Sequence, residues 1–400
     1  MSRNRRVARS LPASPRSVVT ARSPGDLVAA IPYLVGFTPS RSLVVISLRG
    51  ARLRFGLVAR VDLPDEGVEQ AAARSLCGFV MRDRPREAVV VVYDERPWDP
   101  TLRPWQSLVD ALGAELAGHH VSVREAMYVT PQRFWSFTCT RNSCCPDDGW
   151  PLSEATASPV AVAYVLNGCS PFADRPTLAA RLAPSGPLTT AAVDYATEAA
   201  LDAVAPWWQA AGESRWIAWQ RECVAHFDAL TRRYVEGGIT VSPDEAGRLL
   251  AGLTDVGVRD VVGCRWTRWW QSLPHPPAGS SDPLEALVQA LTDDAPAPDV
   301  ADLEVREAVG RLLLDLAVRT EGTGALAPLT LLAMHAWSSG QGAHAGVALD
   351  RALAIDRRYQ LALLVDALLR SGLEPSWVGA DRAEDESAPP RRPRDVPLTG

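Results

Sequence analysis

The sequence contains no lysine, and all 41 of its basic residues are arginine. Its 47 acidic residues outnumber these arginines, and the formal net charge is −6. Proteins that bind nucleic acid usually carry a basic surface, so this composition argues against a nucleic-acid partner. Residues 1–22 are the exception, with six arginines and no acid. We predict that they form a disordered, solvated tail, and an electrostatic arm is the alternative.

Long hydrophobic runs are also missing. No stretch reaches the ~18 apolar residues that a membrane span requires, and no apolar segment follows the first arginines as it would in a signal peptide. The seven cysteines are an odd number without regular spacing, which fits a reducing compartment better than a disulfide framework. We therefore expect a cytoplasmic protein with no membrane partner.

Catalytic signatures are absent as well. The sequence has no phosphate-binding loop, no His-Glu-x-x-His motif and no nucleophile elbow. Residues 322–327 match a dinucleotide-binding fingerprint nominally, but they follow a predicted helix instead of a strand, so we reject that match. The sequence predicts no cofactor and favours a protein that is not an enzyme.

The first part of the chain predicts an α/β domain over residues 23–170. Its clearest element is the Val-rich run 88–93, which is typical of a sheet strand buried on both faces. The other predicted strands and helices alternate around this run, as in an α/β domain with a mixed sheet. Strands are predicted over 43–48, 52–63 and 121–130, with the first two forming a hairpin, and helices over 24–32, 66–81 and 105–117. A Cys- and Trp-rich segment at 133–151 is predicted to be irregular.

The rest of the chain is predicted to be all-α. Helical periodicity covers 155–166, 176–182, 190–211, 214–236, 243–251, 282–292 and 302–320. We predict a helical region over 171–271, a helical domain over 284–378 and a disordered, charged, Pro-rich tail over 379–400. Within 325–370 the spacing of Trp337, Gly340 and Ala345 predicts an αα-hairpin that resembles one tetratricopeptide unit.

Three carboxylates are candidate ligand-binding groups. Asp94 and Glu95 follow the Val-rich strand, and ligands collect beyond the carboxyl ends of strands in open α/β sheets. The pair could bind a metal or act as acid and base, or it could simply end the strand. Asp26 is the third candidate, and its alternative is a helix cap, because Ser23 and Pro24 before it are typical of a helix start.

Cys139, Cys144 and Cys145 are candidate metal or thiol groups. The four-residue gap fits zinc thiolates, but a structural zinc site needs four ligands and adjacent cysteines rarely reach one ion. Zinc, a reactive thiol and incidental buried cysteines therefore remain as alternatives.

An arginine-flanked tryptophan cluster is a candidate partner surface through cation–π contacts, and core packing is its alternative. The cluster consists of Arg265, Trp266, Arg268 and Trp269.

Several segments together resemble the uncharacterised actinobacterial family called domain of unknown function 4192. They are residues 26–39 with 42–46, the run Val90-Val-Val-Tyr-Asp-Glu95, the stretch from Trp135 to Cys144-Cys145-Pro146, and the Ala- and Trp-rich hairpin that ends near Leu373. The resemblance covers roughly residues 20–378. It implies membership of a family without supplying an activity.

Our leading hypothesis is a non-catalytic intracellular protein that binds a small molecule or an unknown protein partner. One alternative is a metal-dependent hydrolase-like enzyme that uses Asp94, Glu95 and the Cys139–Cys145 segment. The second alternative is a thiol redox sensor.

Overall fold

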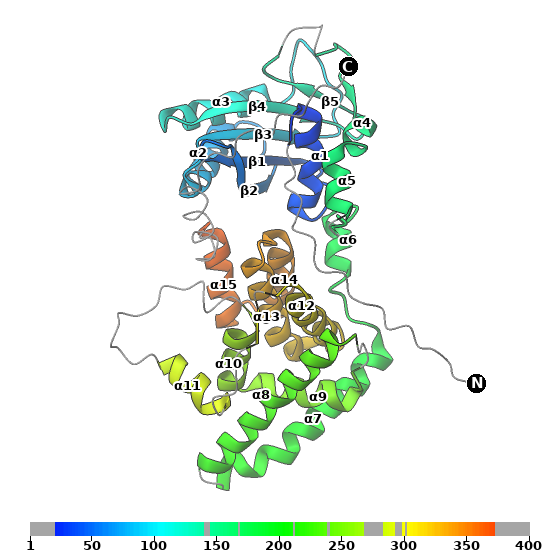
Figure 1. Ribbon diagram of the computed structural model, residues 1–400, viewed down its shortest axis with the longest axis vertical. Helices are drawn as coiled ribbons and strands as arrows, with labels where there is room; N and C mark the ends of the chain where they lie inside the picture. The colour runs from blue at the N-terminus through cyan, green and yellow to red at the C-terminus, as the bar shows by residue number, and fades with distance from the viewer. Residues whose placement is uncertain are drawn as a thin grey trace, which may run out of the picture. The chain divides into compact units, whose positions relative to one another are not determined.

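The computed structural model describes residues 21–139, 145–166, 169–210, 213–237, 241–267, 283–292, 298–300 and 302–372. The chain divides into two compact units, residues 1–175 and 176–400. The first unit holds a mixed six-stranded sheet with helices and the second is helical (Figure 1), so the predicted order of an α/β part and an all-α part is confirmed. The predicted disordered tails lie almost entirely outside the described residues.

The sheet has the strand order β2-β1-β3-β4-β5-β6. β3 and β4 are parallel, and every other neighbouring pair is antiparallel. The strands are β1 (Ser42–Arg49), β2 (Arg54–Asp62), β3 (Glu87–Tyr93), β4 (Ser122–Val129), β5 (Arg133–Ser136) and β6 (Trp150–Pro151). The predicted hairpin of β1 and β2 is confirmed, whereas the prediction that 133–151 is irregular is wrong at β5 and β6, because these short strands depend on pairing with β4 and with each other.

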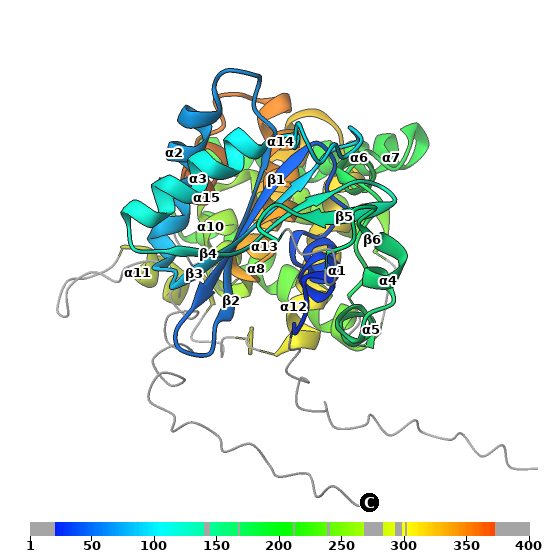
Figure 2. The same cartoon turned by 90° about the horizontal axis from the view of Figure 1, so that it is seen from above.

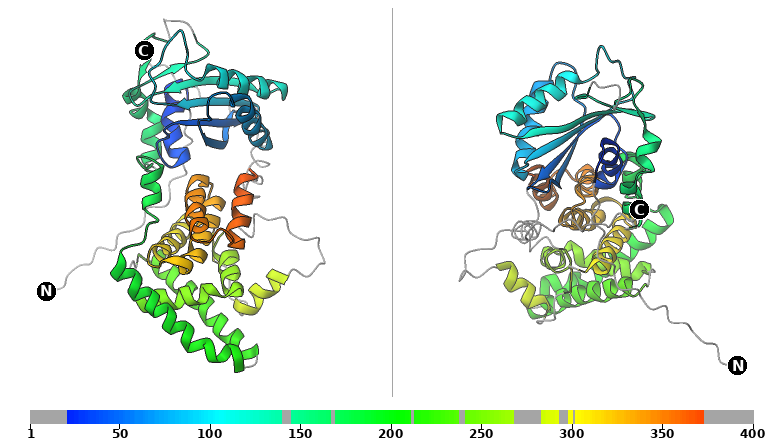
Figure 3. Two further views of the ribbon diagram at one scale, coloured as in Figure 1. Left: turned by 180° about the vertical axis from the view of Figure 1, so that it is seen from behind. Right: turned by 45° about the horizontal axis from the view of Figure 1, so that its top comes forward.

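β3 lies inside the sheet, between β1 and β4, and its residues from Ala88 to Tyr93 are all buried. A strand with apolar side chains on both faces must be covered on both faces. Helices α2 (Glu69–Val80) and α3 (Gln106–Gly118) lie on one face. On the other face lies α1 (Pro24–Val35), with α4 (Leu152–Thr156) and α5 (Pro159–Leu166) beside it (Figures 2 and 3). The prediction of a buried interior strand is confirmed.

α1 begins at Ser23 and Pro24 as predicted, and Ser23 and Asp26 form a capping box there. The Ser23 hydroxyl accepts a hydrogen bond from the Asp26 N–H at 3.1 Å, and the Asp26 carboxylate accepts one from the Ser23 N–H at 3.2 Å. α1 runs past Pro32, where the predicted helix ended, and continues to Val35. Gly36 ends it in the left-handed conformation (φ 88°), with its N–H donating to the Pro32 carbonyl at 2.8 Å.

The buried carboxylate of Asp83 connects the segment that follows α2 to the β1–β2 hairpin through hydrogen bonds. Asp83 accepts hydrogen bonds from the Leu57 N–H at 2.9 Å, from the Arg49 guanidinium and from the Ser47 hydroxyl. This cluster lies directly against Gly56, where a β-carbon would overlap the side chains of Ser47, Arg49 and Asp83. Only glycine therefore leaves room for the buried ion pair.

We expect Gly56→Ala to lower the free energy of unfolding by about 1–3 kcal/mol, because the added methyl group displaces a packed ion pair. Urea unfolding of the full chain, followed by circular dichroism, measures the change. The matched control is Gly78→Ala on the exposed side of α2, where a β-carbon meets nothing within 4 Å. That change should be neutral or stabilise by up to about 1 kcal/mol, and equal losses for the two variants would contradict the packing argument.

The second unit is a helical assembly. Its helices are α6 (Arg175–Ala180), which begins at the unit boundary, then α7 (Pro187–Ala210), α8 (Glu213–Val235), α9 (Pro243–Thr254), α10 (Val256–Trp266), α11 (Pro283–Thr292), α12 (Leu303–Val318), α13 (Leu326–Ser338), α14 (Gly342–Ile355) and α15 (Gln360–Arg370). α10 has no counterpart among the predicted helices. Asp255 begins it by accepting a hydrogen bond from the Val258 N–H at 2.9 Å, and Gly257 and Gly263 weaken its helical signal in the sequence.

α13 is the central helix of this unit, since nearly all of its residues are buried and it packs against α12, α14 and α15. The predicted αα-hairpin is present as α13 and α14, whose likeness to a tetratricopeptide unit stays a prediction. In the part of the chain that the structure describes, no helix combines the length and the apolar character needed to cross a bilayer.

Candidate functional site

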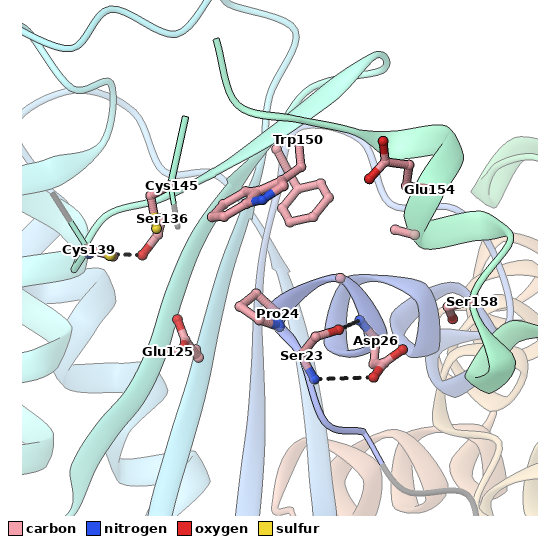
Figure 4. A pocket seen from close by; sticks show the side chains of 13 residues that line it. Ser23, Pro24, Asp26, Glu125, Ser136, Cys139, Cys145, Trp150, Glu154 and Ser158 are labelled. Atoms are coloured by element: carbon pink, nitrogen blue, oxygen red, sulfur yellow. Dashed lines mark hydrogen bonds between the residues drawn. The ribbon is translucent and has the colours of Figure 1, made fainter. Parts of the chain in front are cut away.

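A pocket of about 430 Å³ lies in the first unit, on the face of the sheet that α1 covers. Its volume falls within the about 300–1,000 Å³ that is usual for small-molecule sites. Figure 4 shows it between the sheet, the start of α1 and the segment around α4. It is lined by Ser23, Pro24, Gly25, Asp26, Glu125, Phe134, Ser136, Cys139, Cys145, Trp150, Glu154, Ala155 and Ser158.

The register of β4 decides which of its side chains reach the pocket. Ala88 of β3 pairs with Val123, but the next residue, Val89, pairs with Glu125, so Arg124 is an extra residue in β4. Because side chains alternate between the faces of a sheet, one extra residue exchanges the faces of all that follow. This shift places Glu125 on the α1 face, where it lines the pocket.

The pocket has an aromatic wall. Phe134 of β5 and Trp150 of β6 stack with ring centroids 5.1 Å apart and an interplanar angle of 23°. Gly25 in the first turn of α1 lies against this wall, because a β-carbon there would be 3.5 Å from Phe134 Cζ and 4.0 Å from the Ala155 β-carbon. A larger side chain at position 25 would therefore extend into the pocket.

The three hydroxyl groups that line the pocket already accept hydrogen bonds from the backbone. Ser23 caps α1 as described, Ser136 accepts from the Thr138 and Cys139 N–H groups at 3.2 and 3.1 Å, and Ser158 accepts from the Ala161 N–H at 3.3 Å. No histidine lines the pocket among the described residues, so none of these hydroxyls has an imidazole base beside it there.

The three carboxylates of the pocket differ in their partners. Asp26 accepts hydrogen bonds from the Arg22 and Ser23 N–H groups at 2.9 and 3.2 Å. Glu154 is exposed in the first turn of α4. Glu125 has no hydrogen-bond partner among the described residues, and its burial raises the pKa of its carboxyl group, an effect that the charge of Arg124 partly opposes.

Glu125, Glu154 and the aromatic wall were not among the sequence candidates. One signal pointed to Glu125, because it is the last polar residue of β4 before the apolar run from Ala126 to Val129. The convergence of these side chains depends on strand register and on where α1 lies, which local patterns do not encode.

The structure separates the two acids that were predicted to act together. Asp94 is only 8% exposed, whereas Glu95 is exposed to solvent, and neither lines the pocket. The Asp94 carboxylate accepts hydrogen bonds from Trp105 Nε1 and Arg96 Nε, both at 2.7 Å, and from the Glu95 N–H at 2.9 Å. With these three hydrogen bonds the Asp94 carboxylate stabilises the segment after β3. Little of its hydrogen-bonding capacity remains for a ligand or a proton.

Aromatic side chains fill the space beyond this strand end. Trp98 stacks on Trp135 with ring centroids 5.8 Å apart, and the guanidinium of Arg103 lies 6.0 Å from the Trp98 ring. The Tyr128 hydroxyl donates to the Arg96 carbonyl at 2.7 Å. The edge that the sequence argument chose for a ligand is thus occupied by the protein's own side chains.

Asp26 and two of the three candidate cysteines do come together, because Cys139 and Cys145 line the same pocket. Cys144 lies outside the described residues. Within the described ranges, no group of three or more His, Cys, Asp or Glu side chains has an arrangement that could hold a metal ion.

The hypothesis that Arg265 and Trp266 form a partner surface is wrong. They are 8% and 3% exposed, and both bind the buried carboxylate of Asp228 on α8, with Arg265 Nε lying 3.0 Å from Oδ2. The alternative of core packing therefore holds for these two residues. The other two residues of the cluster, Arg268 and Trp269, lie outside the described residues.

These observations define a protein of two units, in which a mixed-sheet unit with a ligand-sized cavity is followed by a helical unit. The chain belongs to the family named domain of unknown function DUF4192, whose profile matches residues 24–302 and 277–376. The family membership that the motifs predicted is therefore confirmed, and the actinobacterial origin stays a prediction. No curated protein and no solved structure matches the chain significantly.

We expect Asp94→Asn to lower the free energy of unfolding by about 1–3 kcal/mol, because three donors then lose a charged acceptor. Burial by itself would raise the pKa of Asp94, but the hydrogen bonds from Trp105, Arg96 and the Glu95 N–H lower it overall. The stabilisation is therefore complete above the unfolded-state pKa of about 3.9 and is lost as the pH falls through the lower folded-state value.

Chemical unfolding at neutral and acidic pH tests this expectation. The difference between wild type and Asp94→Asn should shrink in acid. The neighbouring Glu95→Gln variant is the control, and it should stay within about 0.5 kcal/mol of wild type at every pH because its side chain is exposed. A pH-independent deficit in Asp94→Asn would contradict the role of the charge.

Proposed function

We propose that this protein is a non-catalytic binding protein whose first unit takes a small molecule in the pocket between β4, β5 and α1. The observation that carries this proposal is the convergence of one aromatic wall and three carboxylates on a cavity of ligand size. Small-molecule sites typically combine such apolar walls with a few polar groups that orient the ligand.

The same side chains favour binding over catalysis. Catalysis by a serine requires a base that can deprotonate its hydroxyl, and no histidine is among the described residues that line the pocket with Ser23, Ser136 and Ser158. The hydrolase-like alternative relied on Asp94 and Glu95, which have separate environments away from the pocket. These arrangements support a site that holds a molecule without transforming it.

The thiol alternative retains one supporting observation, which is that Cys139 and Cys145 share the pocket. A reactive cysteine needs a stabilised thiolate, usually beside a cation. Among the described residues that line this pocket, the charged ones are Asp26, Glu125 and Glu154, which would repel a thiolate. We therefore favour ligand binding over redox sensing.

We expect Gly25→Leu to abolish ligand binding, because its side chain would fill the pocket beside Phe134. Gly25→Ala is the matched control, since its methyl group makes only ordinary contacts. A fragment library of anionic, neutral and cationic compounds is screened against the full-length chain by ligand-observed NMR. Hits should persist in Gly25→Ala and disappear in Gly25→Leu, while both variants keep the circular dichroism spectrum of the wild type.

Two outcomes would overturn the proposal. The first is a set of hits that Gly25→Leu leaves unchanged, which would place binding elsewhere. The second is chemical conversion of a Gly25→Leu-sensitive hit during prolonged incubation, which would show an enzyme.

A further inference from the structure

The chemistry of this pocket selects the charge of its ligand. We infer that the pocket binds a small organic cation, an amine or a guanidine attached to a flat apolar group, with Glu125 as its counter-ion and Trp150 and Phe134 as the surface for the flat group. This inference rests on the proposed function, because it names the class of ligand for the same pocket.

The charged side chains that line the pocket favour a cationic ligand. Among the described residues that line the pocket, three are acidic and none is basic. The start of a helix usually favours an anion, but at α1 the Asp26 carboxylate already accepts the N–H groups of Arg22 and Ser23. An anionic ligand would therefore meet three carboxylates and no basic side chain among the described lining residues, whereas a cation would meet opposite charge.

The hydrogen bonding of Glu125 also favours a cation. Its side chain is only partly exposed, and no described group donates a hydrogen bond to it. A half-buried carboxylate without a donor loses hydration and gains nothing in return. A ligand ammonium or guanidinium would supply the missing donors as a charge-assisted hydrogen bond, which is stronger than a neutral one.

The aromatic wall favours an organic cation independently of the acids. Trp150, which stacks on the buried ring of Phe134, presents aromatic surface to the cavity, as Figure 4 shows above the start of α1. Tryptophan is the best aromatic partner for a cation and also stacks on flat apolar groups. A simple metal ion would leave this wall unused, whereas an organic cation uses both the wall and the carboxylate.

Matched pairs of probes test the inference on the full-length chain. Benzylamine is compared with neutral benzyl alcohol, phenylguanidine is compared with neutral phenylurea, and benzoate is the anion. We expect each cation to bind at least about tenfold more tightly than its neutral counterpart, a difference of about 1.4 kcal/mol. Binding of the cations should be lost in Gly25→Leu and kept in Gly25→Ala.

The role of Glu125 is tested by substitution. Glu125→Gln keeps the shape and removes the charge, so cation affinity should fall about tenfold or more while binding of the neutral probes changes little. Glu125→Asp keeps the charge but draws it back by one methylene group, and it should retain part of the preference for cations. Glu95→Gln, an exposed carboxylate outside the pocket, is the control and should bind every probe like the wild type.

A pH series supplies an independent readout. Cation affinity should weaken as the pH falls, because Glu125 must be ionised, and its burial makes this loss begin at a higher pH than for an exposed glutamate. Among the described residues, Arg124 on β4 is the charged group that acts on Glu125, and Asp26 on α1 and Glu154 on α4 are the other charged groups that line the same pocket. The loss should be absent in Glu125→Gln, which assigns it to this residue.

The outcomes separate the two proposals. If no probe of any charge binds in a manner sensitive to Gly25→Leu, both the inference and the proposed function fail. If neutral probes or benzoate bind there as tightly as the cations, or if Glu125→Gln binds cations like the wild type, only the assignment of a cationic ligand is overturned.

Discussion

Burial of β3 on both of its faces is the constraint from which the first unit is built. Its side chains from Ala88 to Tyr93 are apolar or aromatic and have almost no contact with solvent, so helices must cover the sheet from both sides. Helices α2 and α3 cover one face and α1 lies on the other. Because α1 must lie there, its first turn meets β5 at Gly25 and Phe134, and this meeting forms one side of the pocket.

Three acids in this unit show how partners decide the role of a carboxylate. Asp83 comes shortly before β3 and Asp94 directly after it, and both are buried and saturated by donors. Each fastens an irregular segment to the sheet. Glu125, on the neighbouring strand, is half-buried and accepts no hydrogen bond from the described residues. The first two stabilise the fold, whereas the third is the acid whose hydrogen-bonding capacity remains open to a ligand.

Local patterns were sufficient for much of the fold. The Val-rich strand, the β1–β2 hairpin and the helix start at Ser23 are set by residues within a few positions of one another, and all three are confirmed. Helix α10 was missed because its glycines weaken the helical pattern. β5 and β6 were missed because two- and four-residue strands exist only through their partners.

The candidate site was harder to predict for a physical reason. Asp94 was chosen because it follows a buried strand, but only the tertiary structure brings Trp105 and Arg96 to its carboxylate. From the sequence, Arg265 and Trp266 could form a partner surface or pack in the core. Only the tertiary structure, which brings Asp228 of α8 beside both side chains, decides for packing. The position of Glu125 depends on one extra residue in β4, which no local pattern reveals.

The walls of the pocket come from segments that are far apart in the chain, from Ser23 at the start of α1 to Ser158 before α5. An occupant would touch both ends of this stretch at once and would bind the folded form of the unit alone. By mass action, such an occupant present at a hundred times its dissociation constant adds about 2.7 kcal/mol to the unfolding free energy. If the proposed binding function holds, the cellular abundance of this protein would then rise and fall with the supply of its ligand.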